Sequence, residues 1–403
     1  MSAPPATLGL SYLAQMMFDG VDLQPTFNGL IARANEDPAD AGAWFDLSVI
    51  LMLTGQAEQG LAIQAQALAL SRLYRRIHGD GSGLKVLAIM TSGGFMANTP
   101  LDFMLEGSNV QLDLLYVTED GAFPDDVPVH DLAFLAIGES DENQRVLAAI
   151  TPALAAWPMP VINGRPDRIA ALTRDGVCAM FAGSERIVSP VTSRLDRAVV
   201  EEIARGTAAL ADPLPNAVFP IIIRPVDSHA GQGLEKIDDA EALGAYLAQQ
   251  ASPEFYLSAF VDYSGLGGLF RKTRIAFIAG APFVSHLAIS SRWMVHYLNA
   301  DMAERPERRA EEAAFMADFD GAFAARHAAA FAELQEAFGL DYFAIDCGET
   351  RDGRLLLFEA DVAMIVHAMD SETLYPYKKP AMRRLFNAFQ AMLRAQAGLR
   401  LSQ

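Results

Sequence analysis

Cysteine is scarce in this chain. The 403 residues include only two, Cys178 and Cys347, which lie far apart in the sequence. Two cysteines at this separation do not form a disulfide framework, and they lack the spacing of metal ligands. The sequence therefore favours a reducing compartment, and we expect a cytoplasmic protein.

Basic residues are also in short supply, because 31 Lys and Arg stand against 50 Asp and Glu. The formal net charge is -19, and no broad stripe of basic residues runs along the chain. A protein that binds a phosphate backbone needs such a stripe. We therefore expect no nucleic-acid partner.

Long apolar runs are missing as well. No stretch approaches the about 20 apolar residues that a membrane helix needs. The first residues also lack a basic start that leads into an apolar segment and a small-residue cleavage site. We expect neither export nor a membrane span. Hydrophobic residues nevertheless make up 51% of the chain, which is enough for two or three domains with proper cores.

The N-terminal region is predicted to be helical throughout residues 6–78, because apolar residues recur there at helical spacing. Trp44, Leu47, Leu51 and Gly55 have a spacing similar to that in the first helix of a tetratricopeptide repeat, of which one unit is visible. Such repeats need neighbours to bury their faces. We interpret this region as a helical cap or dimerisation element, with a partner-binding module as the alternative.

Strands and helices alternate after Gly83. Strands are expected over 84–90, 110–117 and 132–137, and the alternation predicts a small parallel α/β unit. The first of these strands runs into a glycine turn at 91–94, at the end of the strand where open α/β sheets bind ligands. A tight turn and a substrate contact both fit this segment.

Two strand-like runs on either side of Asp352 and Gly353 carry three carboxylates. If those two residues form the turn of a hairpin, Asp346 falls directly opposite Glu359, which shares a strand face with Asp361. Like charges this close repel one another unless a cation neutralises them. The pattern predicts a magnesium site, and a solvated strand face is the alternative.

Several arginines indicate an anionic ligand. Arg224 lies in the apolar run 219–225, so it must meet either an internal carboxylate or a ligand phosphate. The glycine-bearing loop 228–233 supplies backbone N–H groups that suit phosphates. Arg274 and Arg292 are further candidates for phosphate oxygens, with structural salt bridges as the alternative. Together these features favour a nucleotide.

The order of these parts resembles the ATP-grasp superfamily over roughly residues 84–396. The resemblance implies an α/β and α+β fold, with an N-terminal helical region, a small parallel α/β pre-grasp domain, and antiparallel sheets that flank a nucleotide cleft. The domains would be 1–80, 84–165 and 166–403, the last with a small lid part at about 190–255 and a C-terminal part at about 256–403. The stretch 163–174 looks like the entry to the grasp fold in the branch that joins amino acids to carboxylates.

The resemblance also implies the site residues. Asp346, Glu359 and Asp361 map to the metal ligands, although the family has Asn at the last position. Arg224, where the family has Lys, and Arg274 map to the phosphate-binding positions. Other nucleotide contacts map to the glycine loop and to the hinge between the two halves: His229, Ala230, Gly231, Gln232, Gly233, Tyr256, Leu257, Ser258, Ala259, Phe260 and Val261.

The implied activity is that of an ATP-dependent carboxylate-amine ligase that uses ATP and Mg²⁺. A carboxylate would attack the γ-phosphate of ATP to give an acyl phosphate, and an amine would then displace phosphate. Arg292 would hold the acyl phosphate or a carboxylate, and His367 would act as a base or contact the acceptor. A structural role is the alternative for both residues.

The expected substrates are a small-molecule or peptide carboxylate and an amine. Two rival functions stay open at this point. One is a kinase on the same fold, and the other is a non-catalytic, nucleotide-gated interaction protein. Residues 1–80 would supply the surface for a homodimer or a protein partner.

Overall fold

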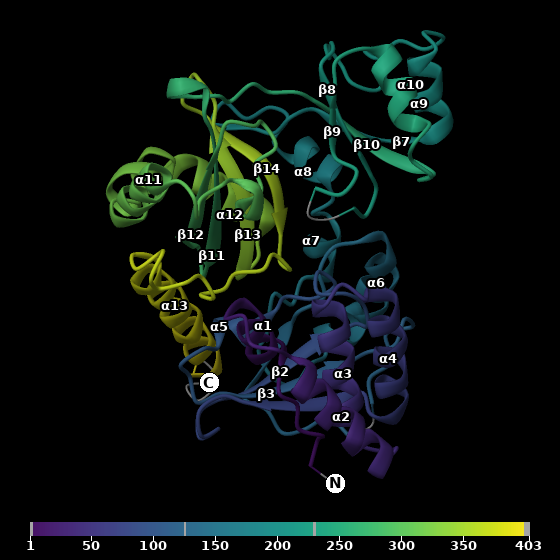
Figure 1. Cartoon of the computed structure of the whole chain (residues 1–403), viewed down its shortest axis with the longest axis vertical. Coiled ribbons are helices and arrows are strands. Elements are labelled where there is room, and N and C mark those ends of the chain that lie inside the picture. The colour runs from purple at the N-terminus through teal and green to yellow at the C-terminus, as the bar shows by residue number, and fades with distance from the viewer. Residues whose placement is uncertain (1–2, 125, 229–230, 399–403) are drawn as a thin grey trace.

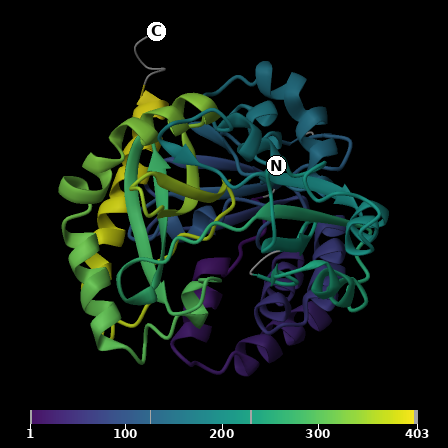
Figure 2. The same cartoon turned by 90° about the horizontal axis from the view of Figure 1, so that it is seen from above.

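The computed structural model describes residues 3–124, 126–228 and 231–398. These residues build three sheets in three lobes, with the first sheet in the lower lobe of Figure 1. Figures 1 and 2 both place the second sheet beside the third. The architecture agrees with the predicted fold class. No helix within the described ranges combines the length and the apolar character needed to cross a membrane.

The N-terminal region is helical up to residue 70, with α1 (Leu10–Phe18), α2 (Gln24–Glu36), α3 (Ala41–Leu53) and α4 (Ala57–Leu70). The prediction of helix through residue 78 was wrong, because Leu73–Ile77 form strand β1 at the edge of the first sheet. Arg75 on β1 pairs with the buried Asp113 across the sheet at 2.6 Å. A segment of five residues that includes two arginines is too short for its period to separate a strand from a helix.

The first sheet has the order β1-β3-β2-β4-β5. The predicted strands are present as β2 (Lys85–Met90), β3 (Gln111–Tyr116) and β4 (Leu132–Leu135), with β5 (Val161–Ile162) beside β4. Neighbours among β2 to β5 pair in parallel, as predicted, while β1 runs antiparallel to β3. The short α5 (Leu101–Met104) and the longer α6 (Asp141–Ala155) connect these strands.

The second sheet is antiparallel with the order β7-β10-β8-β9. Its strands are β7 (Thr192–Asp196), β8 (Ile221–Pro225), β9 (Glu235–Ile237) and β10 (Glu254–Ala259), and α9 (Arg197–Ala204) and α10 (Ala240–Leu247) pack against it. The chain reaches this sheet through α7 (Pro166–Ala170) and α8 (Arg174–Met180). The second sheet has a hydrophobic cluster of its own.

The third sheet has the order β12-β11-β13-β14-β6. Its strands are β6 (Ile187–Val188), β11 (Phe270–Ile278), β12 (Ala281–Ser290), β13 (Tyr342–Glu349) and β14 (Leu355–Asp361). The helical elements of this part are the 3-10 turns Leu266–Gly268 and Tyr297–Asn299, α11 (Pro306–Ala317), the π-helical turn Asp320–Ala324, α12 (Ala328–Phe338) and α13 (Lys378–Gly398). The first and third sheets share one hydrophobic cluster, in which Leu87 and Phe277 are fully buried.

The hairpin of β13 and β14 closes differently from the prediction. Its loop has three residues instead of Asp352 and Gly353 alone, because Thr350 N–H donates to the carbonyl of Arg354 at 3.0 Å. The pairing next to the loop is therefore shifted by one residue. An irregularity farther along β14 removes this shift, so Asp346 does lie opposite Glu359.

The helical region is joined to the first sheet by packed aromatic rings. Tyr74 of β1 is fully buried, stacks on Phe45 with 4.4 Å between ring centroids, and donates its hydroxyl to the carbonyl of Ala67 at 2.6 Å. The Phe45 ring also meets Tyr116 of β3 edge-on. Helices and sheet therefore share these contacts and are not separately packed.

Replacing Tyr74→Ala should lower the free energy of unfolding by about 3–5 kcal/mol, because it removes a large buried ring and leaves a cavity. Urea denaturation followed by circular dichroism measures this change. Tyr12→Ala, which truncates an exposed ring, serves as the control and should change stability by less than about 0.5 kcal/mol. A loss of less than about 1 kcal/mol at Tyr74 would contradict the shared packing.

Candidate active site

An open cavity of about 690 Å³ lies between the second and third sheets. It is walled by β9, by the segment after β10 and by the segment after β12. The aromatic rings Phe260 and Trp293 meet edge-on there, and Lys236 Nζ lies 5.1 Å from the centroid of the Phe260 ring. The lining residues are Leu234, Glu235, Lys236, Phe260, Asp262, Ser264, Gly268, Phe270, Ser291, Arg292, Trp293 and Met294. The volume falls within the about 300–1,000 Å³ usual for small-molecule sites.

Strand β11 links this cavity to a group of charged residues. Phe270, which lines the cavity, shares one strand face with Lys272 and Arg274, because alternate residues of a strand point the same way. The strand pairing places Arg274 directly opposite Asp346 of β13. The aromatic wall of the cavity and the charged residues therefore belong to one surface of the third sheet.

Asp346 is buried, and both of its carboxylate oxygens are paired with cations. Arg274 donates Nε to Oδ1 at 2.8 Å and Nη2 to Oδ2 at 3.0 Å, while Lys272 Nζ donates to Oδ2 at 2.7 Å. Burial alone would raise the pKa of Asp346, but Arg274 and Lys272 outweigh it and hold that pKa well below its usual range. The carboxylate is therefore charged and already neutralised by the protein.

Glu359 has a cationic partner as well. Arg174 at the start of α8 donates Nη2 to Glu359 Oε2 at 2.5 Å. Burial raises the pKa of Glu359, but the Arg174 charge outweighs it and lowers that pKa to about 2. Sequence reasoning did not pair these two residues, because they lie 185 positions apart and no local pattern connects them.

Asp361, the third predicted metal ligand, is in a different electrostatic state. It accepts a hydrogen bond from Ala363 N–H at 2.9 Å. Burial and the negative charge of Glu359 raise its pKa to about 7. The pKa of Glu139 is also raised to about 7, first by burial and then by the nearby negative charge of Asp361. These two carboxyls are therefore only partly ionised at neutral pH.

The predicted magnesium site does not fit this arrangement. Within residues 3–124, 126–228 and 231–398, no three or more His, Cys, Asp or Glu residues are grouped so as to hold a metal ion. The oxygens of Asp346 already accept hydrogen bonds from Lys272 and Arg274, and Glu359 is bonded to Arg174. The predicted pairing of Asp346 with Glu359 was confirmed, but the cations that neutralise these carboxylates are side chains of this chain.

Arg224 of β8 is buried and anchors the loop that follows it. Its Nε donates to Ser228 Oγ at 3.1 Å, and its Nη2 donates to the carbonyl of Ser228. Burial, assisted by the charge of Arg174, lowers the pKa of Arg224 to about 10. Arg224 remains protonated at neutral pH, but its guanidinium lacks a carboxylate partner among the ion pairs found for the described residues.

The described part of the glycine loop comes close to the cavity at Gly231. His229 and Ala230 fall outside the described residues. A Cβ added at Gly231 would stand 3.6 Å from Met294 Sδ, which places this part of the loop beside the cavity wall. Gly233 has a φ of +65°, and a Cβ there would come within 2.7 Å of Pro225, so this position requires glycine. Gln232 lies between these two glycines.

The predicted hinge residues divide between the cavity and the core. Tyr256 and Leu257 lie within β10, and Leu257 is fully buried in the cluster of the second sheet, so its side chain is not available to a ligand. Ser258 Oγ lies 2.8 Å from Thr192 Oγ1. Ala259 ends β10, and the chain leaves the sheet through Phe260 and Val261, of which Phe260 lines the cavity.

Arg292 and His367, the other predicted catalytic residues, lie in different places. Arg292 lines the cavity beside Trp293. His367 packs near Phe18 of α1 and Phe103 of α5, with ring centroids 5.6 and 6.1 Å away. Burial and the nearby Lys378 charge lower the pKa of His367 to about 4, so its imidazole is neutral at pH 7.

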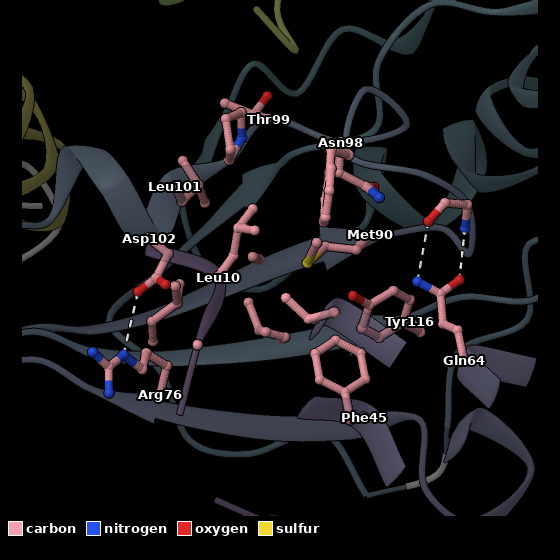
Figure 3. Close-up of a pocket in the computed structure, with 18 of the residues that line it drawn as sticks. Leu10, Phe45, Gln64, Arg76, Met90, Asn98, Thr99, Leu101, Asp102 and Tyr116 are labelled. Atoms are coloured by element: carbon pink, nitrogen blue, oxygen red, sulfur yellow. Dashed lines mark hydrogen bonds and ion pairs between the residues drawn. The ribbon is translucent and has the colours of Figure 1, made fainter. Parts of the chain in front are cut away.

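A second, smaller cavity of about 90 Å³ lies between the helical region and the first sheet (Figure 3). At one end Arg76 pairs with Asp102, and at the other Gln64 exchanges two hydrogen bonds with the backbone of Gly93. The predicted glycine turn at 91–94 is thus fixed to α4. A space of this size does not admit a nucleotide.

Comparisons with known proteins gave structural neighbours only. No family model matches the chain, and no curated protein matches it. Among similar solved structures are a RimK domain ATP-grasp protein from Sphaerobacter thermophilus, with 13% identity, a TM-score of 0.43, and coverage of 76% of this chain and 98% of that one.

Two other similar structures are ligases. The VanG D-Ala:D-Ser ligase from Enterococcus faecalis has 12% identity and a TM-score of 0.46, and the match covers 77% of this chain and 99% of that one. The D-alanine–D-alanine ligase from Bacillus anthracis has 12% identity and a TM-score of 0.45, with coverage of 78% and 99%.

Replacing Asp361→Asn should stabilise the protein against unfolding, and the gain over the wild type should be larger at pH 8 than at pH 5. The raised pKa of Asp361 means that its contribution to stability is complete below about pH 4 and is lost as the pH rises through about 7. Asn does not ionise, so the variant should gain about 1–2 kcal/mol at pH 8 and much less at pH 5.

Urea denaturation at the two pH values measures this difference. Asp212→Asn, at an exposed position, is the control for the loss of one surface charge. An equal effect of Asp361→Asn at both pH values would show that this carboxyl is ionised throughout.

Proposed function

We propose that this protein is an ATP-dependent ligase that activates a carboxylate as an acyl phosphate and joins it to an amine. The main support is the gathering of Arg174, Arg224, Lys272 and Arg274 around Asp346 and Glu359, in a chain whose net charge is -19. Lys272 and Arg274 share a strand face with Phe270 of the cavity wall. A concentration of cations on one cleft surface of an acidic protein favours a ligand with several negative charges, such as a triphosphate.

In this proposal the second and third sheets have different roles. The second sheet, with α9 and α10, is the lid part at about 190–255, and the third sheet is the base of the site. Phe260 and Phe270, which both line the cavity, supply apolar surface for the base of the nucleotide. Arg224 and the glycine loop hold the phosphates from the lid side, while Lys272 and Arg274 face them from the third sheet.

The chemistry needs no protein nucleophile. A carboxylate oxygen of the substrate attacks the γ-phosphorus, the bond from that phosphorus to the bridging oxygen breaks, and ADP leaves with the electron pair. The amine then attacks the acyl carbon, phosphate leaves, and the amine proton passes to solvent. The four cations stabilise the charge that develops on the transferring phosphoryl group.

The two other predicted catalytic residues, Arg292 and His367, have different roles in this proposal. Arg292 lines the cavity and is proposed to hold the acyl phosphate or the acceptor carboxylate. The low pKa of His367 favours a contact to the acceptor over a role as general base. No step is assigned to a metal held by Asp346, Glu359 and Asp361, because two of these carboxylates are already paired.

Incubating the protein with MgATP and a deproteinised small-molecule extract tests the reaction. We expect release of ADP and phosphate, together with a product whose mass is that of two extract components less one water. A product that is heavier by one phosphate would identify a kinase instead. Binding of ATP without turnover would favour the non-catalytic, nucleotide-gated function, and no ATP binding would overturn the proposal.

Replacing Arg224→Met should weaken ATP binding by about tenfold or more, because a charge-assisted hydrogen bond is worth about 1.5–3 kcal/mol. Isothermal titration calorimetry measures the change. Arg186→Met, at an exposed arginine that is 3.7 Å from Glu333, is the matched control and should bind ATP like the wild type. Unchanged affinity in Arg224→Met would mean that this guanidinium serves only to hold Ser228.

A further inference from the structure

The strand pairing of the third sheet fixes two cations beside Asp346. Arg274 and Asp346 are directly paired residues of β11 and β13, and Lys272 lies two residues away on the same face of β11. Residues diagonally opposite on neighbouring strands are within reach of long side chains. The ammonium of Lys272 therefore meets Asp346 because of the backbone register, at an Nζ to Oδ2 distance of 2.7 Å.

This pairing leaves no room for a divalent ion on Asp346. A magnesium ion needs ligand oxygens at about 2.0–2.1 Å with free lone pairs, whereas three N–H groups already point at the two oxygens of this carboxylate. The Asp346 side chain is only 2% exposed, so solvent screens little of the repulsion between an incoming metal and the two cations.

The same two cations are suited to an anionic ligand. The side chains of Lys272 and Arg274 are 17% and 19% exposed, so both remain partly accessible from solvent while they hold Asp346. An ammonium has three N–H donors and a guanidinium has five, which leaves donors for a phosphate after the carboxylate is satisfied. Arg174 likewise forms an ion pair with Glu359 while its own side chain stays partly exposed.

We propose that Lys272 and Arg174 are tethered cations in the places where a divalent metal would otherwise bind Asp346 and Glu359. The site then receives the phosphates of a nucleoside triphosphate without a metal held by the protein. This inference rests on the proposed function, because it describes how that nucleotide site balances the charge of its ligand. Magnesium reaches the cleft only as the ion that ATP carries from solution.

A double-mutant cycle with Mn²⁺ alone tests the place of Lys272. Mn²⁺ affinity is measured by electron paramagnetic resonance, without nucleotide, for the wild type, Asp346→Asn, Lys272→Met and the double variant. In the wild-type background Asp346→Asn should leave Mn²⁺ affinity unchanged. In the Lys272→Met background the same change should weaken Mn²⁺ binding by about tenfold or more. Loss of the ammonium frees one lone pair of Asp346 Oδ2 and removes one of the two cations that repel the ion, although Arg274 still donates to both oxygens.

Either of two results overturns the inference. One is a loss of Mn²⁺ affinity when Asp346 is replaced in the wild type, which would make Asp346 a metal ligand despite Lys272. The other is no gain of Mn²⁺ affinity in Lys272→Met. Lys379→Met removes a surface lysine that pairs with Glu372 and controls for the loss of one positive charge. Lys272→Gln replaces Lys272→Met if circular dichroism shows that the methionine variant does not fold.

A second measurement uses the unaltered protein. Calorimetric titration with ATP should give the same affinity in EDTA as in excess Mg²⁺, whereas a loss of about tenfold or more in EDTA would refute the inference. If ATP binds under neither condition, the proposed function fails, but the Mn²⁺ cycle still decides whether Lys272 excludes a metal from Asp346. The two failures are therefore distinguishable.

Discussion

The pairing of β11 with β13 is the constraint on which the site depends. It brings Arg274 opposite Asp346 and places Lys272 on the same strand face, so a buried carboxylate and two cations form one bonded group. A buried charge is costly unless it is paired, and the loss of one partner leaves the other exposed to that cost. Strand register, charge state and ligand preference are therefore linked at this point of the third sheet.

The second sheet contributes to the site from a separately packed unit. Its hydrophobic cluster is distinct, whereas the first and third sheets share theirs. Arg224 and the loop after it thus belong to a part that also contacts the first lobe through an ion pair, that of Arg194 with Asp141 at the start of α6.

The N-terminal helices pack against the first sheet and fix the position of nearby segments. Tyr74 and Phe45 join them to the first sheet, and Gln64 of α4 bonds both backbone groups of Gly93. The glycine turn after β2 is consequently held by the helical region, and the neutral His367 packs near Phe18 of α1. The region thus shapes two segments that the sequence had marked as candidates for substrate contact.

Sequence by itself determined the element types where the pattern was long: the parallel strands of the first sheet and the acidic hairpin. It also placed Asp346 opposite Glu359. The hairpin differs from the expected one in two ways, a longer loop and an irregular pairing, and the second difference offsets the first, so this pair is kept. Local period and turn chemistry are sufficient for such features because they involve neighbours along the chain. Strand β1 was missed because its short run carries no clear period.

Only the tertiary structure decided what neutralises the carboxylates. Lys272 lies 74 residues from Asp346, and Arg174 lies 185 residues from Glu359, so no spacing in the sequence pairs them. The acidic pattern required a cation but did not say which one. Its identity follows from which strands and helices meet in space, because the charge balance of a buried site depends on every element packed around it.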